Sequence, residues 1–455
     1  MSFILSLLVL LITGSFVTAI ILRRRTIGFF SLEFLGLSFF SGLGFINLQF
    51  FLFYLLNIKF ELLNLILIQA AIGIVVLYYF IKQFKNKGGL ADLAVFGPLD
   101  GIEKLFLAGI ILQFCWIFYL TLPVPVNSFD ALASYAFKAK IFYLNKGVPG
   151  GFFNWSESLV GHPDYPTLLP FFMTWVYLFT GFNDLTVMNI MPVTFAFFLA
   201  LFYSQLKKFF NRKYALGAVF IIATIPNVYR YATIIHADIF VLAFITCAFL
   251  YFMFYIRYSN KEFLILSSVL FALSAWIKNE AVVFIFAFLA CLVARGKSRW
   301  LRHLGLAILI IFLISGPWFI LKISKHMVNS DINYSALTLS RVLANFKDIP
   351  IMLDEFQKQV FSPKNWNIFW VVVISTLAFN FKKLFKGELF YISLFLAISI
   401  SCYFIAYMLV TQERLDFYLE KTLPRFMIHF SGVFLFLTVY LFWDKFRKLN
   451  KEPVC

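Results

Sequence analysis

The stretch DIFVLAFITCAFLYFMFYI, residues 238–256, decides the class of fold. After its first residue it contains no charged side chain, and the basic residue Arg257 follows it directly. A membrane-spanning helix needs about 20 predominantly apolar residues, which this stretch nearly supplies by itself. The whole chain is 62% hydrophobic and 13% charged, whereas a soluble domain carries about 25% charged residues. The sequence therefore predicts an all-α polytopic membrane protein.

Apolar segments of the same kind recur along the whole chain. A transmembrane helix is predicted wherever the sequence stays apolar for close to the length that a bilayer requires. We therefore expect about thirteen transmembrane helices, at residues 3–22, 28–54, 61–81, 104–122, 187–206, 214–229, 238–256, 262–277, 280–294, 303–322, 367–380, 389–411 and 428–443.

Clusters of Lys and Arg predict how these helices are oriented. Each cluster follows an odd-numbered segment, so all of them fall on one face, and short cytoplasmic loops carry an excess of these residues. The N-terminus is then outside and the C-terminus is cytoplasmic. The formal net charge of +17 follows from this topology, and we expect no nucleic-acid partner. The clusters lie at residues 23–25, 82–87, 207–213, 257–261, 295–302, 382–386 and 445–451.

The connections divide the chain into three predicted regions. These are an N-terminal extension of three helices at residues 1–103, a membrane core at 104–443 and a cytoplasmic tail at 444–455. Two extracytoplasmic connections, 123–186 and 323–366, are long enough to hold structure of their own. Because function concentrates in such loops, we look for the site there.

One apolar stretch in the first long connection is predicted not to cross the membrane. It covers residues 167–181, after Pro166 and up to Gly181. A crossing at this point would put the basic cluster 207–213 on the outer face, against the positive-inside pattern. We therefore expect an interfacial or re-entrant helix.

Residues 262–294 are predicted to form a short hairpin, because basic clusters flank both of its ends. Each arm of about 15 residues rises about 22 Å, less than the ~30 Å apolar core. The apex, Lys278-Asn279-Glu280, then lies below the outer surface, where ionisable groups need partners or water. We predict that Lys278 binds a phosphate and that Glu280 orients an acceptor or another side chain. The alternative is a mutual ion pair.

The sequence NSFDALASYAFKAKIFY, residues 127–143, follows the fourth predicted span. Asp130 is predicted to be a carboxylate base at a membrane-surface cavity. The alternative is an acid in the first turn of a helix, which the helix dipole favours. Asn127 or Ser128 is predicted to cap that helix, and Lys140, further along it, is a candidate substrate-binding residue.

The sequence GHPDYPTLLP, residues 161–170, contains three prolines that hold it out of regular helix. A rigid turn would display His162, Asp164 and Tyr165, which we predict to be substrate-binding residues. The alternative is a plain loop leading into the next helix.

Three further charged residues are expected on the outer face. Asp238, in IIHADIF, is a candidate second catalytic carboxylate or else an N-terminal helix acid. Arg230 is a candidate ligand of a donor phosphate or else an interfacial anchor. Arg425 lies in ERLDFYLEKTLPRFMIHF, residues 413–430, which has the composition of an interfacial amphipathic helix. It could clamp a lipid phosphate at headgroup level, and the alternative is ordinary snorkelling.

Together these motifs resemble the GT-C superfamily of glycosyltransferases, in the bacterial branch related to protein O-mannosyltransferases and lipid A aminoarabinose transferases. The resemblance runs from about residue 104 to 443 and rests on FDALASYAFKAK, HPDYP, HAD, KNE and LPRFMIHF. It implies a catalytic acid at Asp130, a second acid at Asp238, a lysine turn at Lys278 and a loop helix at 167–181. The turn reads HPDYP rather than HPPL, and the first three helices lie outside the minimal family pattern.

The resemblance implies an inverting transfer from a polyprenyl-phosphate sugar to a glycolipid, glycan or protein acceptor. The protein would be a multi-pass protein of the bacterial inner membrane with its active site facing outside. An acceptor hydroxyl needs a positioned base, for which Asp130 is the candidate. The departing phosphate needs cations, for which Lys278, Arg425 and Arg230 are candidates. Asp130 and Asp238 could also hold a divalent cation, and no other cofactor is expected.

Two other classes of function fit a chain of this composition. A secondary transporter would place ionisable groups near the midplane and often shows paired broken helices in two halves. Most spans here are free of charge, and no repeat between halves is visible. A non-catalytic component of a surface polysaccharide assembly system would need no pair of acids.

Overall fold

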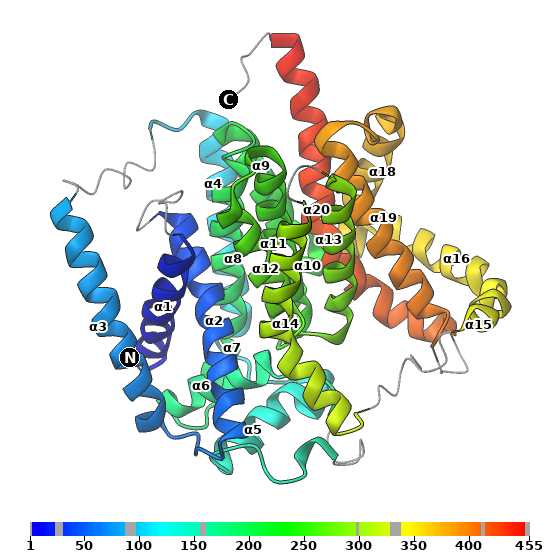
Figure 1. Ribbon diagram of the computed structural model, residues 1–455. Helices are drawn as coiled ribbons and strands as arrows, with labels where there is room; N and C mark the ends of the chain where they lie inside the picture. Colours follow the sequence, from blue (N-terminus) through cyan, green and yellow to red (C-terminus); the bar gives the residue numbers. More distant parts are fainter. Residues whose placement is uncertain are drawn as a thin grey trace. The chain divides into compact units, whose positions relative to one another are not determined.

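The computed structural model describes residues 2–22, 31–86, 97–154, 161–296, 300–327, 338–410 and 415–450. Across these ranges the chain is helical and forms no β-strand, which confirms the predicted all-α fold (Figure 1). In the same ranges, eight helices are long and apolar enough to cross a membrane. They are α1 (Ser2–Ile21), α2 (Leu32–Leu55), α4 (Gly101–Thr121), α7 with α8 (Asp184–Leu206), α11 (Ala237–Tyr258), α14 (Trp300–Ser324), α19 (Gly387–Tyr407) and α20 (Leu415–Asn450).

The other predicted spans also coincide with helices, but these are shorter or less apolar. They are α3 (Leu62–Asn86), α9 (Arg212–Thr224), α12 (Lys261–Ser274), α13 (Val282–Arg295) and α18 (Phe369–Phe379). The predicted span 214–229 is broken, because α9 ends and α10 (Pro226–Tyr231) starts at a proline that cannot continue the helix. The predicted orientation in the membrane stays a prediction, and the first basic cluster, 23–25, lies outside the described residues.

Short helices fill the connections. Within its described residues, the second long connection, 323–366, holds four of them, as expected for a region with structure of its own. The short elements are η2 (Ala131–Tyr135), α5 (Ala136–Leu144), η3 (Phe152–Asn154), α6 (Leu168–Thr180), η4 (Asn279–Ala281), α15 (Leu339–Ala344), η6 (Asn345–Asp348), α16 (Ile349–Val360), α17 (Pro363–Trp366) and η7 (Phe381–Lys383).

The chain folds into two compact units. Unit 1 comprises residues 1–205 and 232–237, and unit 2 comprises residues 206–231 and 238–455. The predicted regions 1–103, 104–443 and 444–455 divide the sequence differently and stay a prediction.

Unit 1 is organised around α1, α2 and the short helix α6. The first two approach closely at Gly14 and Gly42, where an added Cβ would collide with the backbone of the facing helix. Helix α6 starts after Pro166 and ends at Gly181, which has φ +74°, as the sequence predicts. Its 13 residues span about 20 Å, too short to cross the apolar core. Most of its side chains are buried against other helices of unit 1, and its predicted interfacial or re-entrant position stays a prediction.

Unit 2 is built around α11, whose side chains are buried almost throughout. Phe249 contacts Phe395 of α19 and Phe436 of α20, and Phe252 contacts Phe288 of α13. This apolar packing fixes α11 and therefore the position of Asp238 in its first turn. Helix α20 is continuous from Leu415 to Asn450, so the predicted loop helix at 413–430 and the last span form one element.

Candidate active site

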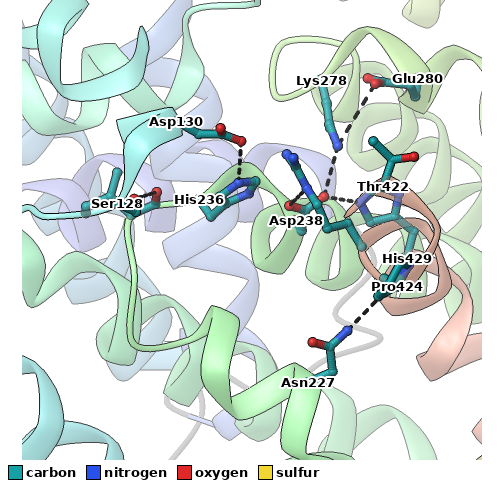
Figure 2. A network of polar contacts seen from close by, with 12 residues as sticks. Ser128, Asp130, Asn227, His236, Asp238, Lys278, Glu280, Thr422, Pro424 and His429 are labelled. Carbon is teal, nitrogen blue, oxygen red and sulfur yellow. Dashed lines mark hydrogen bonds and ion pairs between the residues drawn. The ribbon is translucent and has the colours of Figure 1, made fainter. Parts of the chain in front are cut away.

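In unit 2, the carboxylate of Asp238 is fully buried and accepts hydrogen bonds from three side chains (Figure 2). Its Oδ1 lies 2.9 Å from Nζ of Lys278 and 2.7 Å from Nε2 of His429. Its Oδ2 lies 3.3 Å from Nε of Arg425. A buried carboxylate is costly unless it is paired and hydrogen-bonded, and these donors supply both conditions. Asp238 is therefore the counter-ion of a buried cation cluster.

Three elements of unit 2 bring these residues together. Asp238 lies in the first turn of α11, where the helix dipole favours a negative charge. Lys278 immediately precedes η4, in the turn between α12 and α13, so the predicted hairpin with a lysine apex is confirmed. Arg425 and His429 are four residues apart on α20 and so project from the same face of that helix.

Lys278 has a partner that the sequence did not suggest. Its side chain is 2% exposed, and its Nζ lies 4.0 Å from Glu280 and 2.9 Å from Asp238. The ion pair with Glu280 that the sequence offered as an alternative is therefore present, but Asp238 is the closer carboxylate. The nearest carboxylate comes from a helix 40 residues earlier in the chain, which spacing along the sequence could not reveal.

A histidine that the sequence analysis did not single out extends the cluster. His429 is fully buried and lies between Asp238 and Tyr403 of α19, with 3.1 Å from its Nδ1 to the tyrosine hydroxyl. A carboxylate only accepts hydrogen bonds, so Nε2 of His429 carries the hydrogen. Nδ1 of the neutral ring then accepts from Tyr403. The only sequence signal was the position of His429 one turn after Arg425.

Asp130 belongs to unit 1 and has a more open environment. Its side chain is 33% exposed, and its Oδ2 lies 2.8 Å from Nε2 of the buried His236 (Figure 2). The π-helical turn η2 follows it directly, a local geometry that is frequent at functional sites. The predicted Ser128 cap is wrong, because the Ser128 hydroxyl donates to the carbonyl of Ile235 instead. His236 was visible only as the first letter of the HAD motif.

The predicted rigid turn at 161–166 also lies in unit 1. The rings of His162 and Tyr165 stack with their centroids 4.3 Å apart, and Tyr165 is 6.1 Å from Tyr135. Asp164 is fully buried. Lys138, which the sequence analysis did not assign, points its ammonium at this turn. Burial lowers the pKa of Lys138 to about 7, and the nearby Asp164 carboxylate partly offsets that shift.

Two predicted residues are more exposed than these clusters. Lys140 lies on α5, and its Nζ is 5.1 Å from the ring centroid of Phe182. Arg230 is exposed in the last turn of α10. Their predicted roles in binding substrate and donor phosphate stay predictions.

A divalent cation does not fit Asp238 in this arrangement. Both of its carboxylate oxygens face cationic donors, Lys278 on one side and Arg425 on the other, and these would repel a metal ion. In the part of the chain that the structure describes, no group of three or more His, Cys, Asp or Glu is placed to hold a metal. We therefore derive no chemical step through a metal.

Comparison with known proteins identifies one family. Residues 164–320 match the family model described as dolichyl-phosphate-mannose-protein mannosyltransferase. The matched residues make up about a third of the chain and include Asp164, Asp238 and Lys278. No curated protein and no solved structure matches the sequence significantly. The family match confirms the predicted resemblance to the GT-C superfamily and supports a multi-pass membrane glycosyltransferase of that type.

Proposed function

We propose that this GT-C glycosyltransferase takes its sugar from a polyprenyl phosphate and transfers it to an acceptor hydroxyl on the extracytoplasmic face of the membrane. The acceptor class is a glycolipid, a glycan or a protein. The observation that carries the proposal is the convergence of Lys278 and Arg425 on the buried Asp238. Two cations held in an apolar unit are suited to a phosphate that arrives with a lipid.

The cation cluster would receive the phosphate of the donor. Arg425 is 17% exposed and is therefore the member that an incoming phosphate reaches first. Its guanidinium suits the oxygens of a phosphate because it can donate two parallel hydrogen bonds. Lys278, held by Asp238, adds a second positive charge behind it. In this proposal Asp238 is a positioning residue for both cations, and not the second catalytic carboxylate that the sequence suggested.

Asp130 would act as the general base. One third of its side chain is exposed, so an acceptor hydroxyl can approach the carboxylate, and His236 holds this carboxylate through a hydrogen bond to Oδ2. As the acceptor oxygen bonds to the anomeric carbon, its proton passes to Asp130. The bond between that carbon and the phosphate oxygen breaks with its electron pair, and the lipid phosphate leaves. Attack opposite to the leaving group inverts the configuration.

Binding of dolichyl-phosphate mannose, the donor in the family's name, tests the proposal. We expect the full-length protein in nanodiscs to bind it and Lys278→Met to weaken binding at least tenfold. The matched control is Lys358→Met, which removes an exposed lysine of α16 in the same unit. Unchanged affinity in a folded Lys278→Met protein would remove Lys278 from the donor site.

The acceptor is found by comparing cells with and without the gene. Mass spectrometry of surface glycolipids and glycoproteins should show one class that loses a sugar when the gene is absent. An unchanged glycan profile, together with no donor binding in nanodiscs, would contradict the proposed transferase reaction.

A further inference from the structure

Lys138 is a buried charged residue to which the proposed function gives no role. It lies on α5 with a fully buried side chain. Taking a lone ammonium out of water costs several kcal/mol unless its hydrogens find partners. Such a residue persists in a fold when its partners compensate that cost.

The partners of Lys138 are backbone carbonyls of one turn. An ammonium has three hydrogens to donate, and three carbonyl oxygens receive them. The distances from Nζ are 2.7 Å to His162, 3.0 Å to Tyr165 and 3.4 Å to Pro163. A single side chain therefore joins α5 to most of the backbone of the turn at 161–166.

The backbone of this turn is not stabilised well by its own local interactions, so it needs an attachment to another element. His162 has φ +53°, a left-handed conformation that is unfavourable for a residue with a Cβ. Pro163 and Pro166 have no N–H with which to bind neighbouring backbone. A second attachment comes from Gly161, whose N–H donates to the carbonyl of Ala133 at 2.9 Å. An added Cβ at Gly161 would also lie 2.9 Å from that oxygen, so the close approach requires glycine.

The turn at 161–166 also carries aromatic residues, and their ring contacts lead to the proposed base. The stacked rings of His162 and Tyr165 lead to Tyr135, and the ring of Tyr135 is 6.1 Å from that of His236. His236 is hydrogen-bonded to Asp130. A shift of the turn would therefore reach Asp130 through a chain of packed rings.

We propose that Lys138 is a positioning residue: its ammonium fastens the turn at 161–166 to the helix that follows Asp130 and so fixes the stack of His162 and Tyr165 at the substrate. This inference rests on the proposed function, in which Asp130 is the base, and on the predicted binding of substrate by His162 and Tyr165.

Hydrogen–deuterium exchange of the full-length protein tests the fastening without reference to activity. In Lys138→Met, we expect the amides from Gly161 to Tyr165 to exchange at least tenfold faster than in the wild type. The control is Lys146→Met, which removes an exposed lysine in the same unit and should leave these amides unchanged. Unchanged exchange in a folded Lys138→Met protein would overturn the proposal. If that variant does not accumulate, Gly161→Ala loosens the second attachment and should give the same exchange signature.

A double-mutant cycle tests whether the fastening serves the reaction. With dolichyl-phosphate mannose as donor, we expect Lys138→Met and Tyr165→Ala each to lower kcat about tenfold. If Lys138 acts through the turn, the double variant falls little further than either single one, because residues of one network are not additive. A hundredfold loss in the double variant, the product of independent effects, would overturn the positioning role. If the wild type transfers no sugar, the proposed function fails, and the exchange measurement still decides the fastening.

Discussion

Lys138 in unit 1 and Lys278 in unit 2 are both buried lysines, but they are held by different partners. Lys278 faces the carboxylate of Asp238 at 2.9 Å, so its charge is compensated by a full opposite charge. Lys138 faces three neutral carbonyls of a turn, and the Asp164 carboxylate raises its pKa through the electrostatic field. The cation of an ion pair such as that of Lys278 is suited to bind an anionic ligand as well. A cation bound to carbonyls, such as that of Lys138, instead holds the backbone of the turn in place.

The carboxylates of the two units differ in the same sense. Asp130 and Asp238 both stand at the start of a helical segment after a loop, and the sequence assigned both to catalysis. Asp238 is fully buried under three donors, whereas Asp130 is one third exposed beside His236. An acid that must exchange a proton with an acceptor needs access, so the difference supports our proposal that Asp130 is the base and Asp238 the counter-ion.

The largest effect is expected from Asp238→Asn, which breaks the ion cluster of unit 2. Removing one partner of a buried pair leaves uncompensated charge and typically costs about 3–5 kcal/mol of unfolding free energy. Thermal unfolding in detergent should show this loss, and Asp238→Asn combined with Lys278→Met should recover part of it. An Asp238→Asn protein as stable as the Lys358→Met control would show that the cluster is not the buried ion pair described here.

Asp130→Asn is the matching change in unit 1, and it should act on turnover rather than on stability. The amide keeps the size and the hydrogen bonding of the carboxylate but cannot take a proton. We expect kcat to fall by about two orders of magnitude or more, the usual loss for a general base, with normal membrane insertion. Glu61→Gln, an exposed acid of unit 1, is the control. Near wild-type turnover would remove Asp130 from the mechanism and with it the contrast between the two carboxylates.

Local sequence signals predicted the elements that local physics determines. Pro166 and Gly181 bound α6, and the basic clusters on both sides of residues 262–294 predicted the hairpin with Lys278 at its turn. The continuity of α20 was missed, because the mixture of charged and aromatic residues at 413–430 is typical of an interfacial helix separate from the last span. In the structure, the Pro424 carbonyl accepts a hydrogen bond from Asn227, a contact across 197 residues that no local pattern encodes.

The partners within the candidate site could not be predicted for the same reason. Asp130, Asp238, Lys278 and Arg425 were found because charged residues are rare in an apolar chain. The histidines that bind the two acids were missed, because a lone histidine near apolar residues carries no distinctive spacing. His429 meets Asp238 from 191 residues away, and His236 meets Asp130 from 106. Such pairings are set by tertiary packing.

The contrast between the two lysines also predicts a pH dependence. Burial lowers the pKa of Lys138 to about 7 in the folded protein, whereas an unfolded lysine has a pKa of about 10.4. Between these values the unfolded chain binds more protons, so stability rises with pH across that window and is flat below it. The unfolding free energy of the wild type relative to Lys138→Met should rise by about 1.4 kcal/mol per pH unit above pH 7. A flat difference up to pH 9 would mean that the carbonyls of the turn keep Lys138 fully protonated.

The smallest effect is expected from Tyr403→Phe, at the end of the hydrogen-bonded chain in unit 2. The change removes the hydroxyl that donates to Nδ1 of His429 but leaves the ring and the contact of His429 with Asp238 in place. A neutral hydrogen bond contributes about 1 kcal/mol, so a small loss of stability should appear in thermal unfolding. Donor affinity should stay within about twofold, because Asp238 keeps Lys278 and Arg425 in place. Tyr391→Phe, three turns earlier on the same helix, is the control. A tenfold loss of donor affinity in Tyr403→Phe alone would show that His429 needs the tyrosine to hold Asp238, and that the anion site extends to α19.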